Sequence, residues 1–136
     1  MSSLELRIIG TVESTLIDLE SAPLQADEGA PSAKLVFEKE MLPALNGLTP
    51  GDEVVLITWL DRAKRDVLSV HPRGDPARPQ MGVFSTRSPH RPNPLGLHRV
   101  EITAVDGLIV HVAALEALNG TPIVDIKPVL RGSTER

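Results

Sequence analysis

Residues 100–113 read VEITAVDGLIVHVA, and this stretch decides the class of fold. Two arms rich in β-branched residues, 100–105 and 108–113, flank the pair Asp106-Gly107. An Asp-Gly pair between such arms is typical of a two-residue hairpin, in which both turn positions take positive φ. The sequence therefore predicts two antiparallel strands joined at this turn.

Several other short segments have the same β-rich character. We expect strands at 6–12, 34–38, 54–60, 66–71 and 82–86, and one helical turn at 41–45. The run 54–60, VVLITWL, is almost wholly apolar and predicts a buried central strand. No ten-residue stretch has a 3.6-residue period, which disfavours alternating strands and helices. The sequence therefore predicts a mainly β fold: a single domain over residues 1–136, built as a small antiparallel or mixed β-barrel of about seven strands, with few or short helices and no Rossmann fold.

Composition excludes several kinds of protein. The only aromatic residues are Phe37, Trp59 and Phe84, too few for a platform of stacked rings on single-stranded nucleic acid. The absence of cysteine excludes disulfides, thiolate metal sites and a cysteine nucleophile. The N-terminus lacks the pattern of a signal peptide, and no apolar run approaches the length of a membrane span. We therefore expect a cytoplasmic protein without membrane contact.

The net charge of −4 conceals an uneven distribution. Residues 1–61 contain three basic and eleven acidic side chains, residues 62–99 contain eight and two, and residues 100–136 contain three and five. The middle block thus carries six net positive charges. Such a field attracts phosphates or carboxylates, although a solvated loop without any partner is the alternative interpretation.

Two common kinds of site are excluded by spacing. There is no G-x-G motif and no Gly-Lys-Ser/Thr phosphate loop, which disfavours nucleotide folds of those two kinds. The histidines, His71, His90, His98 and His111, contain no pair spaced i, i+4. We expect no metal site.

Residues 81–97, MGVFSTRSPHRPNPLGL, are the densest candidate for a binding site. Pro89, Pro92 and Pro94 fix φ at intervals and bias the residues before them toward extended geometry. A loop stiffened in this way loses little conformational entropy when it binds a ligand. It presents Arg87, Ser88, Arg91 and Asn93. The alternative interpretation is a proline-rich turn that only closes the barrel.

Four stretches of this sequence resemble one known family. They are IGTVES at 9–14, MGVFSTRS at 81–88, RPNPLG at 91–96 and GTPIVDIKP at 120–128. They resemble the TsaA-like family, whose characterised members are the TrmO-type tRNA methyltransferases, and the resemblance spans nearly the whole chain. It implies a small β-barrel that binds S-adenosylmethionine as a homodimer, with the pocket near the subunit interface. It also implies tRNA as the substrate, methylated at N6 of the threonylcarbamoylated adenosine at position 37.

The resemblance implies which residues contact the cofactor. They are Pro23, Leu24, Gln25, Leu60, Asp61, Arg87, Leu97, Ala117, Leu118, Asn119 and Gly120. This sequence departs from the family pattern at four positions: Leu24 stands for an arginine, Glu116 and Asn119 stand where aspartate is frequent, and Val129 stands for a tyrosine. The chain also ends at Arg136, without the C-terminal extension of many bacterial tRNA enzymes of the family. We expect these departures to affect tRNA specificity more than cofactor binding.

We expect Arg91, with Arg73 and Arg78, to pair with substrate phosphates or with a threonylcarbamoyl carboxylate, because a guanidinium group suits both. Asn93 is expected to accept a hydrogen bond from the substrate amine. No catalytic residue is assigned, because a sulfonium methyl group is already activated and needs positioning more than a nucleophile. Two alternatives stay open: a non-catalytic S-adenosylmethionine-binding regulatory dimer, and a methyltransferase for a small anionic metabolite.

Overall fold

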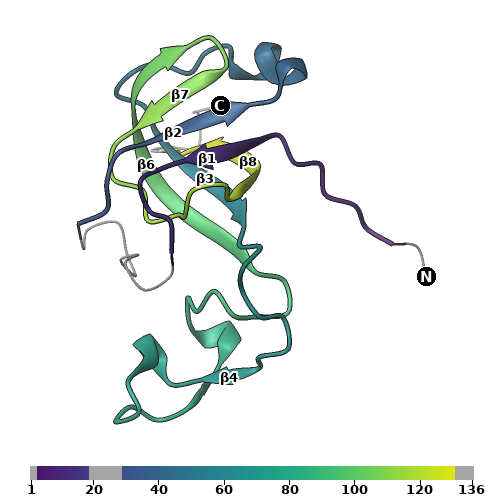
Figure 1. The fold of residues 1–136 in the computed structure, drawn as a ribbon, viewed down its shortest axis with the longest axis vertical. Helices are drawn as coiled ribbons and strands as arrows, with labels where there is room; N and C mark the ends of the chain where they lie inside the picture. Colours follow the sequence, from purple (N-terminus) through teal and green to yellow (C-terminus); the bar gives the residue numbers. More distant parts are fainter. Residues whose placement is uncertain (1–2, 19–28, 131–136) are drawn as a thin grey trace.

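The computed structural model describes residues 3–18 and 29–130, which form a β-barrel with a small two-stranded ribbon below it (Figure 1). The strands are β1 Gly10–Glu13, β2 Ala33–Phe37, β3 Glu53–Trp59, β4 Ser69–Val70, β5 Met81–Gly82, β6 Leu95–Asp106, β7 Ile109–Val112 and β8 Pro122–Pro128. The helices within residues 3–18 and 29–130 are the short 3₁₀ segments η2 Lys39–Leu45, η3 Pro72–Gly74 and η4 Val83–Ser85. The predicted mainly β fold with few short helices is confirmed over these residues.

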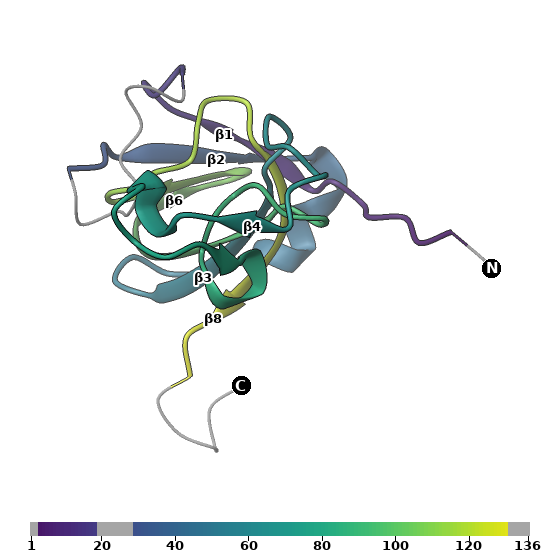
Figure 2. The same ribbon diagram turned by 90° about the horizontal axis from the view of Figure 1, so that it is seen from below.

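Six strands form the barrel in the order β1-β2-β7-β6-β3-β8, and every pairing is antiparallel. The ring closes where β8 returns to β1 through the pairs Gly10↔Ile123 and Thr11↔Pro122. The predicted central strand, β3, has neighbours on both sides, β6 and β8. The ribbon of β4 and β5 lies beneath one end of the barrel, as the view from below shows (Figure 2).

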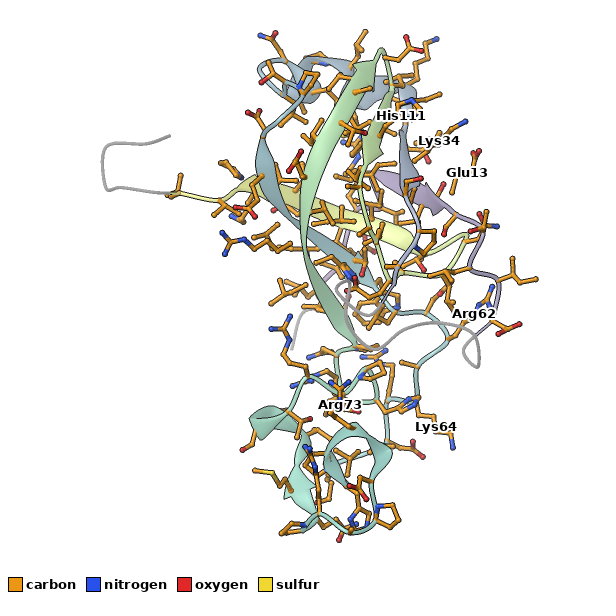
Figure 3. The ribbon with its side chains drawn as sticks, turned by 90° about the vertical axis from the view of Figure 1, so that its left-hand side faces the viewer. Glu13, Lys34, Arg62, Lys64, Arg73 and His111 are labelled. Atoms are coloured by element: carbon orange, nitrogen blue, oxygen red, sulfur yellow. The ribbon has the colours of Figure 1, made fainter. Side chains whose placement is uncertain are left out.

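Alternation along the strands places an aliphatic core inside the barrel. The side chains of Leu35, Leu56, Ile102, Val110 and Ile123 are fully buried there. Adjacent positions face outward because successive side chains of a strand point to opposite faces. On the outer face the paired residues Glu13, Lys34 and His111 form a charged row across β1, β2 and β7 (Figure 3).

Four predicted strands have limits that differ by more than one residue from those in the structure. The first begins at Gly10 instead of residue 6, because Ile9 makes only isolated backbone bonds to Ile123 and Glu38. Segment 66–71 forms only the two-residue β4, and segment 82–86 turns into η4 after Gly82. The strand predicted at 100–105 is much longer, 95–106, because the proline-dense segment ends at Pro94 and pairing with β3 starts at once.

The predicted hairpin joins β6 to β7, but its turn lies one residue later than expected. Asp106 pairs with Ile109, so the two loop residues are Gly107 and Leu108. Gly107 has a φ of 61°, whereas Leu108 does not have positive φ. One positive φ at the first loop position, occupied by glycine, is the type II′ pattern, so the expectation of two positive-φ positions was wrong.

Candidate functional site

A cavity of about 520 Å³ lies where β3 and β6 meet the proline-dense loop. Its wall comes from four parts of the chain: the end of β3 and the turn after it, loop 87–93, the start of β6, and segment 116–121. This volume lies within the range of small-molecule sites, about 300–1,000 Å³. The lining residues are Ile57, Leu60, Asp61, Arg62, Ala63, Arg87, Ser88, Pro89, His90, Arg91, Asn93, Leu95, Gly96, Leu97, His98, Glu116, Ala117, Leu118 and Thr121.

Most of the expected site residues that the structure describes line this cavity. Among the expected cofactor contacts these are Leu60, Asp61, Arg87, Leu97, Ala117 and Leu118, and among the expected substrate contacts Arg91 and Asn93. Pro23, Leu24 and Gln25 lie outside the described residues. The proline-dense loop and the segment before the Asn-Gly turn, some 25 residues apart in sequence, therefore share one cavity.

Asn119 and Gly120 support the cavity wall without lining it. The Asn119 side chain accepts a hydrogen bond from the Ser14 backbone N–H (3.0 Å), and its own backbone N–H donates to the Leu16 carbonyl (2.7 Å). The Gly120 N–H donates to the Val12 carbonyl (2.7 Å), and its φ of 84° favours glycine. The turn thus ties segment 116–121 to β1.

Arg73 and Arg78 do not line the cavity. Both belong to the ribbon, Arg73 in η3 and Arg78 in the loop after it, where Arg78 Nε lies 3.9 Å from Asp75 Oδ2. Arg73 lies near the junction of the barrel and the ribbon, as do Arg62 and Lys64 (Figure 3). The contact of Arg73 and Arg78 with substrate stays a prediction. It requires a substrate that extends from the cavity to the ribbon.

Arg91 lines the cavity, and its guanidinium group also holds the loop together. Nη1 donates to the carbonyl oxygens of Thr86 (3.1 Å) and Ser88 (2.7 Å), and Nη2 donates to that of Val83 (3.0 Å). The Thr86 and Ser88 carbonyls lie outside any strand or helix and gain a partner in this way, whereas the Val83 carbonyl, at the start of η4, also accepts from the Thr86 backbone N–H. The side chain predicted to bind a substrate anion therefore already has partners in its own loop.

Replacing Arg91 by lysine is expected to loosen this loop while preserving the charge. A single ammonium group cannot reach three carbonyl oxygens in the planar arrangement that a guanidinium group fits, so at least one hydrogen bond is lost. We expect a loss of about 1–3 kcal/mol in the free energy of unfolding, measured by urea denaturation. Arg78→Lys, in the exposed ribbon, is the matched control. Equal stability of both variants would contradict the bracing role.

Asn93 is held by a second arginine. Arg65 donates from Nη2 to Asn93 Oδ1 (3.1 Å) and from Nε to the Pro92 carbonyl (2.7 Å), and its guanidinium carbon lies 5.1 Å from the centre of the Trp59 ring. The Trp59 face attracts this cation and fixes its position. The oxygen expected to accept from the substrate amine therefore already accepts one hydrogen bond, which leaves it a single lone pair for a ligand.

Sequence reasoning missed a series of hydrogen-bonded polar side chains, Thr58, His98 and Glu116, in the wall of the cavity. His98 is only 6% exposed; its Nε2 lies 2.7 Å from Thr58 Oγ1, and its Nδ1 lies 2.5 Å from Glu116 Oε1. Gly96 makes room for this arrangement, because a Cβ at that position would lie 2.4 Å from Thr58 Oγ1 and 2.7 Å from His98 Nε2. A lone histidine before a predicted strand carries no sequence signal for such a role.

The Glu116 carboxylate is the last group in this series of hydrogen-bonded side chains. Burial raises the pKa of Glu116, but the hydrogen bond and electrostatic interaction with His98, a backbone hydrogen bond and the nearby Arg87 guanidinium together lower it below its ordinary value. Its other oxygen, Oε2, is buried and has no hydrogen-bond partner among the described residues. The cavity wall therefore contains an ionised carboxylate with one oxygen left over for a ligand.

Within residues 3–18 and 29–130 no group of three or more histidine, aspartate or glutamate side chains is placed to hold a metal ion. The same residues contain no helix of the length and apolar character needed to cross a bilayer. The polar groups that line the cavity are arginine, histidine, serine, threonine, asparagine and carboxylate side chains, set among apolar residues.

Comparison with known proteins shows relatives that cover nearly the whole chain. A "Probable S-adenosyl-L-methionine-binding protein" of Methanothermobacter thermautotrophicus is 42% identical over 130 residues, covering 94% of this chain and 93% of that protein. One of the same description from Archaeoglobus fulgidus is 39% identical over 128 residues, again 94% of this chain but only 34% of the relative.

Solved structures agree on the fold. TrmO from Pseudomonas aeruginosa superimposes with a TM-score of 0.77 at 23% identity, over 99% of this chain and 61% of that one. Another TrmO structure gives 0.76 at 26% identity, over 99% of this chain and 63% of that one. This chain thus spans about three fifths of the length of those proteins. The family model described as the tRNA-methyltransferase O N-terminal domain matches residues 11–133, and the chain belongs to that family.

Proposed function

We propose that the cavity binds S-adenosylmethionine and that this chain is a methyltransferase that modifies N6 of threonylcarbamoyl-adenosine at position 37 of tRNA. The observation that carries the proposal is that two segments distant in sequence meet in the wall of one cavity. They are residues 87–97, which comprise the proline-dense loop and the start of β6, and segment 116–121. Both segments contain the positions at which the family pattern has its cofactor contacts. The relatives from Methanothermobacter thermautotrophicus and Archaeoglobus fulgidus, described as probable S-adenosyl-L-methionine-binding proteins, support the same ligand.

The donor set of the cavity fits this cofactor. A buried carboxylate is stable only with a partner, and Glu116 Oε2 has none among the described residues. A ligand that carries a cationic sulfur and hydrogen-bond donors would supply one. Apolar side chains such as Leu60, Leu97 and Leu118 make up much of the remaining wall, which suits an adenosyl group.

The residues of the chain would act by positioning and by excluding water. When bound, the cofactor supplies an activated methyl group, so the protein needs to hold the acceptor nitrogen in line with it. Arg91 and the prolines fix loop 87–94 before any ligand arrives, and the apolar wall keeps water from the reacting atoms. Asn93 retains an acceptor site for the substrate amine.

Basic side chains beside the cavity support an RNA substrate. Arg62, Lys64 and Arg73 lie where the barrel meets the ribbon (Figure 3), and residues 62–99 carry six net positive charges. An RNA phosphate backbone would bind such a surface with a strong dependence on salt concentration. This substrate would place the protein in the cytoplasm.

A homodimer is part of the proposal. Leu95 and Leu97 lie on the outer face of β6, line the cavity and are 43% and 49% exposed. A second subunit that covers this face would bury both leucines and complete the rim of the cavity. Analytical ultracentrifugation over a range of protein concentrations tests this part.

The function is tested by transfer of a labelled methyl group from S-adenosylmethionine to tRNA. We expect label in tRNA that carries the threonylcarbamoyl group and none in tRNA that lacks it. Asn93→Ala should lower the rate about 10²-fold, because misplacing the acceptor by about 1 Å has an effect of that size. Ala77→Ser, in the exposed ribbon, is the control.

Two outcomes would replace the proposal. Cofactor binding without transfer to any tRNA would favour a non-catalytic regulatory protein. Transfer to a small anionic metabolite alone would favour the remaining alternative. Mass spectrometry of tRNA and metabolites from a deletion strain distinguishes the two.

A further inference from the structure

Glu116 lines the cavity, and its contribution to ligand selectivity goes beyond the fit to the cofactor described above. Its Oε1 is bound by His98, whereas Oε2 is buried without a hydrogen-bond partner among the described residues. Leaving a carboxylate oxygen unpaired in a protein interior costs free energy unless a ligand pairs with it. The unpaired oxygen therefore indicates a ligand group that is a hydrogen-bond donor or a cation.

The position of this carboxylate is fixed from behind. Since an ionised Glu116 only accepts, the His98 Nδ1–H is the donor of that bond. In the neutral ring Nε2 then accepts from the Thr58 hydroxyl, which is fully buried on β3. Thr58 pairs with Gly96 across the β3–β6 ladder, and His98 lies two residues further along β6, so the His98 ring reaches Thr58 diagonally over the space that Gly96 leaves open. The Glu116 carboxylate is therefore held by a donor that is itself fixed between two strands.

Among the described residues, no arginine of the cavity donates a hydrogen bond to Glu116 Oε2. The Arg87 charge lowers the pKa of Glu116, but the Arg87 guanidinium group donates its hydrogen bond to the Leu97 carbonyl (3.1 Å). Arg91 donates to three carbonyl groups of its loop, and Arg62 donates to the Ile17 carbonyl (3.0 Å). A cationic ligand would therefore meet a carboxylate with one oxygen available.

We propose that Glu116, positioned by His98, makes the cavity prefer the positively charged sulfonium cofactor over its neutral demethylated product. The inference rests on the proposed function. Methyl transfer converts the sulfonium into a thioether, so the bound ligand loses one positive charge while the rest of it is unchanged. A fixed carboxylate in a poorly solvated wall attracts a cation far more than a neutral sulfur. Glu116 would thus favour binding of the cofactor and release of the product.

The test is calorimetric titration with three ligands: S-adenosylmethionine, sinefungin, which carries an amine in place of the sulfonium, and S-adenosylhomocysteine, which is neutral at sulfur. In Glu116→Gln the side chain keeps its size and loses its charge. We expect it to bind both cations about thirtyfold more weakly, because removing one partner of a buried charge pair has effects of at least this size. Its affinity for S-adenosylhomocysteine should change by about twofold at most. Glu101→Gln, exposed on the same strand as His98, should change none of the three.

His98 is tested as a positioning residue by two variants. His98→Asn retains a donor close to the position of Nδ1 and should keep most of the preference for the cations. His98→Leu removes the donor and should abolish the preference. Melting curves of both variants show whether they fold, and the ratio of the affinities for S-adenosylmethionine and S-adenosylhomocysteine is a quantity that a merely structural role would not change.

The outcomes separate the inference from the function on which it rests. Equal weakening of all three ligands in Glu116→Gln would assign the carboxylate to a part that they share, such as the ribose, and would overturn the charge preference. Unchanged binding of the two cations would overturn it as well. If the wild-type chain binds none of the three, the proposed function fails and the inference fails with it.

Discussion

Gly96→Ala is expected to abolish ligand binding in the cavity and to lower the melting temperature of the protein by about 10 °C. The added Cβ would lie 2.4 Å from Thr58 Oγ1 and 2.7 Å from His98 Nε2. Neither atom can move aside easily, because Thr58 is β-branched and fully buried and the His98 ring is held by Glu116. Overpacking and the loss of a buried hydrogen bond together cost about 3 kcal/mol. For a chain of this size that corresponds to about 3 °C per kcal/mol.

The Gly96 prediction has a matched control in Gly82→Ala. A Cβ at Gly82 has as its nearest neighbour the Leu68 carbonyl oxygen at 3.9 Å, and the backbone there is extended, so the variant should melt like the wild type. Adding Thr58→Ala to Gly96→Ala removes the closest clash and should recover part of the stability. Because His98 then lacks its Nε2 partner, ligand affinity should stay low. A Gly96→Ala protein that melts and binds like the wild type would refute the close packing described here.

The buried pair at Gly96 and His98 also explains why sequence reasoning missed the hydrogen-bonded series of Thr58, His98 and Glu116. In the first half of β6 the leucines 95 and 97 face outward, and the glycine and histidine face inward. Alternation normally places the apolar residues inside, so the pattern here is inverted. In addition, the strand was expected to begin only at residue 100, after the prolines. Pairing of Leu95 with Trp59 begins the ladder directly after Pro94, which no local propensity indicates.

Other parts of the structure could be predicted because local chemistry decides them. The apolar run of β3 and the glycine turn between β6 and β7 follow from side-chain pattern and φ preference. The motifs that resemble the family predicted that residues 87–97 and segment 116–121 both contribute to the binding site, and both line the cavity. The role of Arg91 was less accessible, because a guanidinium group binds backbone carbonyls and ligand anions equally well and only the folded loop decides between them. Thus side-chain type identified where the site lies, and the tertiary structure determined what each group does there.

Gly10→Ala is the second substitution with a large expected effect, and it acts on barrel closure. Gly10 is buried on β1, and a Cβ there would lie 2.5 Å from the Val36 carbonyl oxygen and 3.0 Å from Phe37 Cα. Both atoms belong to the backbone of β2, which is bound to β7 on its other side and cannot retreat without breaking that pairing. We expect a loss of about 3 kcal/mol or more in the free energy of unfolding, measured by urea denaturation.

The same substitution should weaken ligand binding although Gly10 does not line the cavity. β1 meets β8 through only two residue pairs, and the chain from Val12 to Leu16 holds the Asn119-Gly120 turn by three hydrogen bonds. A β1 displaced from β2 would therefore release segment 116–121, which includes Glu116. Hydrogen exchange should show lost protection at Val12 and Gly120 together, whereas Thr11→Ala, exposed on the same strand, should preserve it. If Gly10→Ala loosened β1 but left Gly120 protected and ligand affinity unchanged, the cavity would not depend on closure of the barrel.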